Sequence, residues 1–250
     1  MNPDPEHPLR LFIRKLDGIA ALGDDARQAI EQLPITVRTL TSRHDIVQLG
    51  DRPSQCCLIL AGWACRYMLL DQGRRQILSF HMPGDIPDLL SLHLGVMDHS
   101  LCTVGPATVA FVSHKSVRDL TARFPALAAM LWRETLVDAS TFRGWMVGIG
   151  RRSATERVAH LFCELYVRQQ ALQLASDWRC SVPFTQTDLA DALGLTNVHV
   201  NRVIRDLRKD GLATLRTGEL VIHKWQELVA LAEFDAVYLH LNAHETPAEV

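Results

Sequence analysis

The chain has 250 residues, of which 48% are hydrophobic and 22% are charged, a composition typical of a folded globular protein and not of a disordered or fibrous one. This length suits one or two domains. The formal net charge of −2 means that any surface for nucleic acid has to be a local basic one. Residues 1–7 lack the basic and apolar regions of a signal peptide, and the longest uncharged apolar run, 56–65, is half a membrane span. We therefore expect a cytoplasmic protein that does not cross a membrane.

The cysteines form no C-x-x-C pair and no spacing typical of a zinc site. We expect them to be reduced thiols in the core, with a redox-sensing pair as the alternative. Cys56 and Cys57 are neighbours on a predicted strand, where side chains alternate, so only one of them is expected to be able to face outward. The cysteines are Cys56, Cys57, Cys65, Cys102, Cys163 and Cys180.

The segment 35–112 is predicted to be β structure. It contains short apolar runs, such as 57–60, 76–80 and 108–112, and glycines punctuate it at intervals of roughly 10–20 residues. This rhythm is typical of a small antiparallel barrel or roll. No helical pattern of about 10–15 residues separates the runs, which argues against a doubly wound parallel sheet.

From about residue 126, apolar and small residues recur in alternate steps of four and three, which predicts one long helix with a single stripe. A helix of about 25 residues is about 37 Å long, too long for a small barrel to cover alone. We therefore interpret the stripe as the seam of a dimer, and packing on the chain's own barrel is the alternative. The predicted seam residues are Trp132, Thr135, Ala139, Phe142, Met146 and Ile149.

A second amphipathic helix is predicted over 154–170, just after Gly148 and Gly150, which indicate a hinge between the two helices. Apolar residues of this helix are predicted to face the core. Its charged residues Arg157, Glu164 and Arg168 are predicted to face outward.

The stretch 185–211 has the features of a helix-turn-helix in the right order. Thr185, followed three residues later by an aspartate, is a capping pair for a first short helix. Gly194 stands where the turn between the helices needs a positive φ. Thr196 can cap a second helix, which Gly211 ends as the residue after the C-cap. The core side of this helix is predicted to be Val200, Val203, Ile204 and Leu207.

The other side of the second helix carries amides, basic groups and one valine, which suit base edges, phosphates and a thymine methyl group. Between Arg202 and Arg216, five basic residues against two aspartates give a local excess of +3, which attracts a polyanion. Residues 212–222 are predicted to form a hairpin wing around Thr217-Gly218. Together these features predict sequence-specific binding of double-stranded DNA. The outward residues are Asn197, Val198, Asn201, Arg202, Arg205 and Lys209.

The chain resembles the Crp/Fnr superfamily of bacterial transcription regulators. The similar stretches are 46–50, 57–62, 82–86 and 157–161, together with the helix-turn-helix. The resemblance implies an α+β fold with a cyclic-nucleotide-binding-like antiparallel β-roll, a long dimerisation helix and a C-terminal winged helix-turn-helix domain. The expected domains are 1–118 with the N-terminal helices and the roll, 119–150 with the long helix, 151–242 with the DNA-binding domain, and 243–250 as a tail.

The resemblance also assigns roles at the DNA surface. Arg202 matches the family's base-reading arginine and Asn201 a neighbouring base-facing position; Asn197 and Val198 complete the expected base readers. The family usually has a glutamate, which accepts a hydrogen bond from cytosine, where this chain has Val198. We therefore expect a palindromic operator with altered half-sites about one helical turn apart. The expected phosphate contacts are Thr185, Thr196, His199, Arg205, Lys209 and Arg216.

In the sensor domain the resemblance implies a degenerate effector pocket. Family members that bind cyclic AMP hold its ribose with a glutamate and its phosphate with an arginine, and the corresponding residues here are Leu89 or Asp88 and His99. No lysine or arginine lies between Gln76 and His114, and a cyclic phosphate buried without a cation is costly. We expect a regulator that has no cofactor and does not respond to cyclic AMP. A small-molecule effector in the barrel and no effector at all are the two alternatives. The expected pocket residues are Asp85, Asp88, Leu89, His99 and Ser100.

A cyclic-nucleotide sensor and a haem or redox sensor of the same fold are the alternatives. Residues 1–55 contain no cysteine, so an iron–sulfur cluster is not expected. The motifs of common hydrolases, zinc proteases and nucleotide-binding enzymes are absent, and we expect no enzyme. Double-stranded DNA, a second copy of the chain and RNA polymerase are the expected partners. Irregular spacing argues against a metal site at His81, His93, His99 and His114 with Asp85, Asp88 and Asp98.

Overall fold

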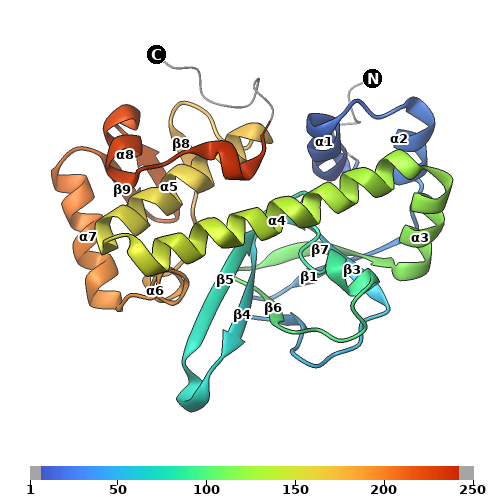
Figure 1. Cartoon of the computed structure of the whole chain (residues 1–250), viewed down its shortest axis with the longest axis horizontal. Coiled ribbons are helices and arrows are strands. Elements are labelled where there is room, and N and C mark those ends of the chain that lie inside the picture. The colour runs from blue at the N-terminus through green and yellow to red at the C-terminus, as the bar shows by residue number, and fades with distance from the viewer. Residues whose placement is uncertain (1–6, 242–250) are drawn as a thin grey trace. The chain divides into compact units, whose positions relative to one another are not determined.

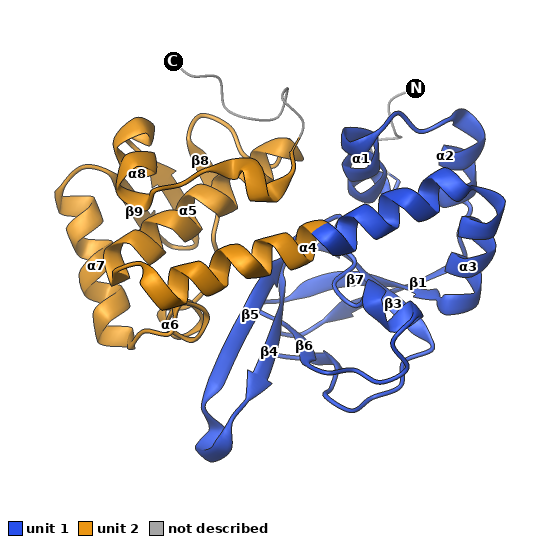
Figure 2. Ribbon diagram, in the orientation of Figure 1, with its two compact units in different colours: residues 1–136 blue, residues 137–250 orange. Residues whose placement is uncertain are grey.

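The structure is a computed structural model that describes residues 7–241, so the predicted tail 243–250 lies outside the described residues. The chain divides into two compact units, 1–136 and 137–250, which Figure 2 colours separately. The boundary falls within one long helix, α4 (Pro125–Arg151). None of the helices between residues 7 and 241 has the length and the apolar character that crossing a membrane requires.

Unit 1 consists of helices and two antiparallel sheets (Figure 1). One sheet has the strand order β1-β7-β3 and the other the order β2-β6-β4-β5. This arrangement confirms the predicted antiparallel roll. The elements are α1 (Arg10–Ile19), α2 (Asp24–Glu31), β1 (Ile35–Leu40), β2 (Asp45–Val47), β3 (Gln55–Ala61), β4 (Ala64–Leu69), the 3-10 helix η1 (Asp71–Gly73), β5 (Arg75–His81), the 3-10 helix η2 (Leu89–Leu92), β6 (Ser100–Thr103), β7 (Ala107–Ser113), α3 (His114–Arg123) and the first part of α4.

Strand β3 is covered on both faces. Cys56 packs into an apolar cluster with residues of α1, α3 and α4, and Cys57 packs into a second cluster together with Ala64 and Leu101 of the other sheet. Both side chains are therefore buried, and the expectation that one of them could face outward is wrong. The alternation of side chains along β3 is real, but it directs them into two cores and not into a core and solvent. All six cysteines are buried, as predicted.

The long helix begins later than the predicted residue 119. Helix α3 is capped by the hydroxyl of Ser113 and ends before Phe124, and Pro125 then starts α4, as proline commonly does at the first helical position. At its other end, α4 continues through Gly148 and Gly150 to Arg151, and the chain leaves the helix at residues 152–153. The break therefore follows the glycines and does not occur at them.

Unit 2 is a set of helices around a small antiparallel sheet with the order β8-β10-β9. Helix α5 packs against α6, α7 and α8, and stacked rings of Tyr166, Trp178 and Trp225 fill part of the core. After α4, the elements are α5 (Ala154–Ala171), β8 (Arg179–Ser181), α6 (Gln186–Leu193), α7 (Asn197–Lys209), β9 (Ala213–Arg216), β10 (Glu219–Ile222), α8 (Trp225–Ala232) and the 3-10 helix η3 (Ala236–Leu239).

The charged residues of α5 do not lie where the sequence predicted them. Glu164 is fully buried, where its carboxylate accepts hydrogen bonds from Trp145, Arg168 and Tyr238. Arg157 is half-buried and donates to backbone carbonyl groups inside unit 2. Arg168 is also half-buried. Amphipathic patterning places charged groups outward, but these residues have internal partners that allow Glu164 to be buried and the two arginines to be half-buried.

Candidate nucleic-acid interface

Helices α6 and α7 form a helix-turn-helix whose ends are set by local interactions. The Thr185 hydroxyl accepts from the Asp188 N–H at 3.1 Å, and the Asp188 carboxylate accepts from the Thr185 N–H at 3.0 Å, which is the predicted capping pair at the start of α6. Gly194 ends α6 with φ 63°, the left-handed conformation that favours glycine. The hydroxyl of Thr196 then accepts from the His199 N–H at 3.2 Å and caps α7.

Backbone hydrogen bonds also cap the C-terminal end of α7. The N–H of Leu212 donates to the carbonyl of Leu207 at 2.9 Å, and the N–H of Gly211 donates to the carbonyl of Arg208 at 3.1 Å. Gly211 has φ 69°. This is the Schellman arrangement, which satisfies the last carbonyl groups of the helix. Both ends of helix α7 are thus defined by hydrogen bonds of the chain itself.

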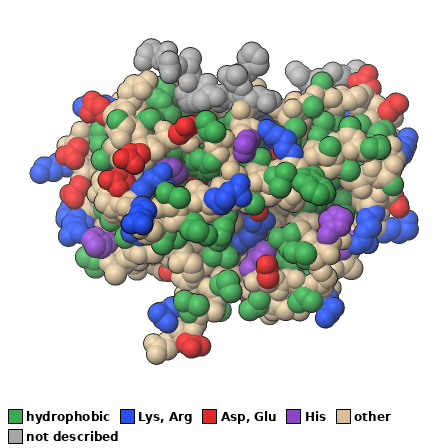
Figure 3. All heavy atoms as spheres, viewed as in Figure 1, with side chains coloured by type: hydrophobic (Ala, Val, Ile, Leu, Met, Phe, Trp, Pro, Cys, Tyr) green, Lys and Arg blue, Asp and Glu red, His purple; other side chains and the backbone are tan. Residues whose placement is uncertain are grey.

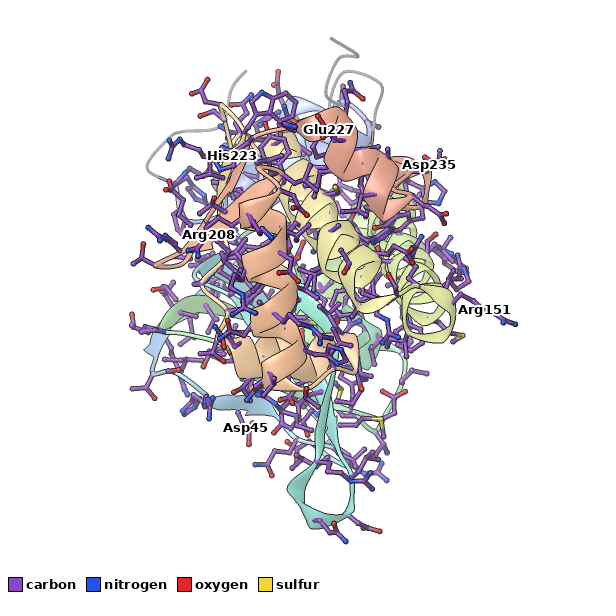
Figure 4. All side chains as sticks on the ribbon, turned by 90° about the vertical axis from the view of Figure 1, so that its left-hand side faces the viewer. Asp45, Arg151, Arg208, His223, Glu227 and Asp235 are labelled. Carbon is purple, nitrogen blue, oxygen red and sulfur yellow. The ribbon has the colours of Figure 1, made fainter. Side chains whose placement is uncertain are left out.

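The two sides of α7 differ sharply. Val200, Val203 and Leu207 are buried and Ile204 is half-buried, as expected for the core side. The opposite side points away from unit 2 and is seen face-on in Figure 4, with Arg208 at one end. Val198 is 80% exposed, a high value for an apolar side chain. The other exposed residues of this side are Asn197, Asn201, Arg202, Arg205 and Lys209, while His199 is half-buried.

Two amides of this surface are oriented by the start of α6. Asn197 Nδ2 donates to Thr187 Oγ1 at 3.2 Å, and Asn201 Nδ2 donates to Gln186 Oε1 at 3.3 Å. The polar surface of α7 therefore extends to Gln186 and Thr187, which were not among the predicted contact residues. Their position in the first turn after the Thr185 cap could have indicated them, because that turn faces the start of α7 in a helix-turn-helix.

The basic side chains of α7 are available for a ligand. Within residues 7–241 no carboxylate forms an ion pair with Arg202 or Arg205, although Asp206 lies next to Arg205 in sequence. Thr185 and Thr196, by contrast, use their hydroxyl oxygens as helix caps. Their expected phosphate contacts would therefore come from the helix N-termini that they cap, where free N–H groups and the helix dipole favour an anion.

The predicted wing is present. Strands β9 and β10 pair antiparallel with Arg216 opposite Glu219, joined by Thr217 and Gly218 with φ 48° and 79°. Positive φ at both central residues is typical of a type I′ hairpin turn. Arg216 is exposed beside this turn, and Arg179 of β8 forms an exposed ion pair with Glu219 at 3.2 Å.

In unit 1, the carboxylate of Asp85 is occupied by bonds to other groups of the protein. It accepts from Lys15 Nζ at 2.7 Å and from the Met82 N–H at 2.9 Å, and Lys15 also pairs with Glu134 of α4. Burial lowers the pKa of Lys15, but the Asp85 and Glu134 carboxylates raise it above its usual range. Asp85 thus joins α1 to the segment after β5, and Lys15 extends this link to α4 within unit 1.

Asp88 is buried, and its carboxylate accepts from the Cys57 N–H at 2.8 Å. Burial raises the pKa of Asp88 to about 7, against the lowering effects of its hydrogen bonds and of Arg66. Arg66, from β4, donates from Nε to the Pro87 carbonyl oxygen at 3.0 Å. The inference that this segment lacks a nearby cation is therefore wrong, because strand pairing brings in an arginine from outside 76–114.

The remaining pocket residues and histidines have separate partners. His99 Nδ1 lies 2.6 Å from Asp98 Oδ1, and the Ser100 hydroxyl accepts from the Leu49 N–H at 3.0 Å. His81 bonds Ser79 and His114 bonds Ser91. Burial lowers the pKa of His114. Leu89 is buried in the apolar cluster beside α1.

Among the described residues, no three or more His, Cys, Asp or Glu side chains are grouped to hold a metal ion.

Comparison with known proteins agrees with this architecture. A family model for a Crp-like helix-turn-helix domain matches residues 156–231, and one for a cyclic nucleotide-binding domain matches residues 37–124. The nitrogen fixation regulation protein FixK of Bradyrhizobium diazoefficiens is 33% identical over 175 residues, which cover 70% of this chain and 72% of that protein. The transcriptional activator protein FnrL of Cereibacter sphaeroides is 25% identical over 188 residues, 74% of this chain and 75% of that protein. A solved structure of FixK2 from Bradyrhizobium japonicum superposes with a TM-score of 0.73 and 26% identity, covering 82% of this chain and 100% of that one.

The fold and the exposed face of α7 define a DNA-binding transcription regulator with a cyclic-nucleotide-binding-like domain and a helix-turn-helix. The chain belongs to the Crp/Fnr family of transcription regulators.

Proposed function

We propose that the protein acts as a homodimer that reads a palindromic operator, with α7 of each copy in the major groove of one half-site. The observation that carries this proposal is the outer face of α7, where amides, guanidinium groups and one valine are exposed on a helix closed at both ends. A helix with this arrangement fits the width of the major groove. In this reading, 1–118 is the sensor, 119–150 contains the dimer helix and 151–242 binds DNA.

The roles proposed for individual residues follow from their chemistry. Arg202 presents a fork of donors that suits guanine, and Asn201 presents an amide that suits adenine. Asn197 completes the polar contacts, and Val198 offers an apolar contact to a thymine methyl group. The basic or helix-start residues that border them suit phosphates. These are Thr185, Thr196, His199, Arg205, Lys209 and Arg216.

The dimer is supported by the apolar stripe of α4. Trp132 is 68% exposed and Met146 60% exposed, and Phe142 and Ile149 are each 43% exposed. Ala139 is exposed and Thr135 half-buried between them. Apolar side chains are visible along the band that α4 occupies on the face shown in Figure 3. A run of large apolar side chains exposed along one helix is typical of a surface that another protein covers.

The first test measures DNA affinity against salt. Purified protein is titrated onto a labelled operator, selected from random DNA, at several salt concentrations. Affinity is expected to fall steeply as salt rises, because phosphate contacts release counterions. Arg202→Ala is expected to weaken operator binding about tenfold or more, while Arg10→Ala, at an exposed site on α1, leaves it unchanged. Equal affinity of the Arg202 variant and the unaltered protein would exclude the proposed role of α7.

The second test measures the oligomeric state. Met146→Glu places a charge in the apolar stripe and is expected to convert the protein from dimer to monomer in sedimentation velocity. Arg151→Glu, at an exposed position at the end of α4, is the control. A monomer at all concentrations in the unaltered protein would contradict the dimer proposal.

We further propose a cytoplasmic regulator that recruits RNA polymerase and does not bind cyclic AMP. The carboxylates of Asp85 and Asp88 are already bonded to Lys15, Met82 and Cys57, which supports a sensor without the usual ribose contact. Calorimetric titration of the full chain with cyclic AMP is expected to show no binding. A saturable heat of binding would favour a cyclic-nucleotide sensor.

A further inference from the structure

A small pocket lies inside unit 2 where α4, α5 and α6 meet. Its walls include Gly148 of α4, Arg152 at the break after α4, Arg157 and His160 of α5, and Leu193 at the end of α6. The free space in it is about 20 Å³. This volume holds one water molecule or one oxygen atom of a larger ligand.

The half-buried Arg152 brings two unsatisfied guanidinium nitrogens to this pocket. Its Nε and Nη1 atoms are buried and, among residues 7–241, have no hydrogen-bond partner. The Nη1 atom lies 3.6 Å from the position that a Cβ on Gly148 would take, so the guanidinium group packs against α4. Buried guanidinium nitrogens without acceptors are costly, because each has lost its water.

Arg157 adds a second positive charge and connects the walls. Its Nε donates to the Arg152 carbonyl oxygen at 2.9 Å, and its Nη1 donates to the Leu193 carbonyl oxygen at 2.8 Å. Neither acceptor carries a negative charge. Arg157 therefore holds the α4–α5 break to the end of α6, and Gly194, which starts the turn to α7, is the next residue after Leu193.

Among residues 7–241, no carboxylate lines the pocket. The buried Glu164 of the same helix is bonded to Trp145, Arg168 and Tyr238 and does not line it. His160, which does line it, stacks on Tyr238, and burial together with the charge of Arg152 lowers its pKa to about 4. The imidazole is therefore neutral near pH 7. The walls that the described part of the chain supplies thus carry two cations and no anion.

We propose that this pocket binds a small oxyanion, a carboxylate or a phosphate group whose oxygen enters to accept from Arg152. Such a group supplies the acceptor that the buried nitrogens lack, and charge-assisted bonds of this kind are strong. Because the walls come from α4, α5 and the end of α6, the bound anion would tie the end of the long helix to the helix-turn-helix within unit 2. The site is distinct from the DNA surface of α7.

The test measures thermal unfolding of the full chain with sodium acetate, with inorganic phosphate and with sodium chloride at equal ionic strength. At least one oxyanion is expected to raise the Tm by several degrees above chloride, saturating with concentration. Arg152→Gln is expected to weaken this binding at least tenfold, and Arg151→Gln, at the neighbouring exposed residue (Figure 4), to leave it unchanged. Acetate alone would identify a carboxylate site and phosphate alone a phosphate site.

Phosphate can also bind at the DNA surface of α7, and the variant Arg202→Gln distinguishes binding there from binding in the pocket. The oxyanion effect is expected to persist in this variant. An effect lost only in Arg202→Gln, an effect kept in Arg152→Gln, or none beyond chloride would each overturn the proposal. In chloride alone, Arg152→Gln is expected not to lower the Tm, because it removes two buried nitrogens that have no hydrogen-bond acceptor. A loss of several degrees there would make Arg152 a structural residue and overturn the proposal too.

Discussion

Trp145 donates a 2.9 Å hydrogen bond from its indole Nε1 to the buried carboxylate of Glu164, which joins α4 to α5 within unit 2. The same oxygen accepts from the Tyr238 hydroxyl at 2.6 Å, and Arg168 donates to the other oxygen at 3.3 Å. The tie links residues that lie 19 and 74 positions apart in sequence. The carboxylate of Glu164 thus connects α4, α5 and η3 in the core of unit 2.

We predict that Glu164→Ala lowers the free energy of unfolding by about 3 kcal/mol, because it leaves buried donors without an acceptor. Glu164→Gln keeps one acceptor oxygen and is expected to lose less. Urea denaturation followed by tryptophan fluorescence measures both. The control is Glu227→Ala, whose exposed ion pair with Lys224 is expected to contribute under about 1 kcal/mol. Equal losses for Glu164→Ala and Glu227→Ala would contradict the role given to Glu164.

A second prediction concerns the effect of a side chain at Gly62 on the free energy of unfolding. This residue has φ 81°, and a Cβ at this position would lie 2.5 Å from the Pro106 carbonyl oxygen. Gly62→Ala is expected to cost about 2 kcal/mol or more, because both the backbone conformation and the close backbone contact exclude a side chain. Gly105→Ala, where a Cβ meets nothing within 4 Å, is the matched control in unit 1. A Gly62 variant as stable as the Gly105 variant in urea would be inconsistent with this packing.

The helix-turn-helix was predictable because its determinants are local. The capping pair at Thr185, the turn at Gly194 and the end at Gly211 each depend on residues within a few positions in sequence. The same holds for the Thr217-Gly218 turn of the wing, whose residues adopt the positive φ that the turn requires. Local rules of this kind do not need a knowledge of the tertiary fold.

Three of the errors concern partners that are distant in sequence. Glu164 looks like a surface residue of an amphipathic helix until Tyr238 is brought beside it. Arg66 looks unrelated to the 84–89 loop until its guanidinium reaches Pro87. Cys56 and Cys57 look like one inward and one outward residue until cores form on both faces of β3. Periodicity gives the direction of a side chain, but only the packing of distant segments decides what lies there.

Asp88 gives a prediction about pH. Burial raises its pKa from 3.8 to about 7 in the folded chain, so between these values the folded state holds a proton that the unfolded state releases. Stability from this group therefore falls as pH rises from about 4 to about 7, by up to about 4 kcal/mol. Asp88→Asn keeps an acceptor for the Cys57 N–H and removes the charge. The free energy of unfolding of this variant, measured by urea denaturation, is expected to equal that of the unaltered protein near pH 4 and to be higher at pH 8. A difference that does not change with pH would show that Asp88 is ionised throughout.

Val198 gives a prediction about specificity. It is the most exposed of the large apolar side chains on α7, at 80%, and it offers a base only an apolar contact. Val198→Glu is expected to select operators with a cytosine at the contacted position, because the carboxylate accepts from the cytosine amino group, and to bind DNA more weakly overall because it repels phosphates. The preference for cytosine over thymine is expected to change by about tenfold in competition binding. Val198→Ile keeps the apolar contact and is expected to keep the original preference. If the glutamate and isoleucine variants rank the four bases alike, residue 198 does not face a base, and the orientation of α7 proposed above is wrong.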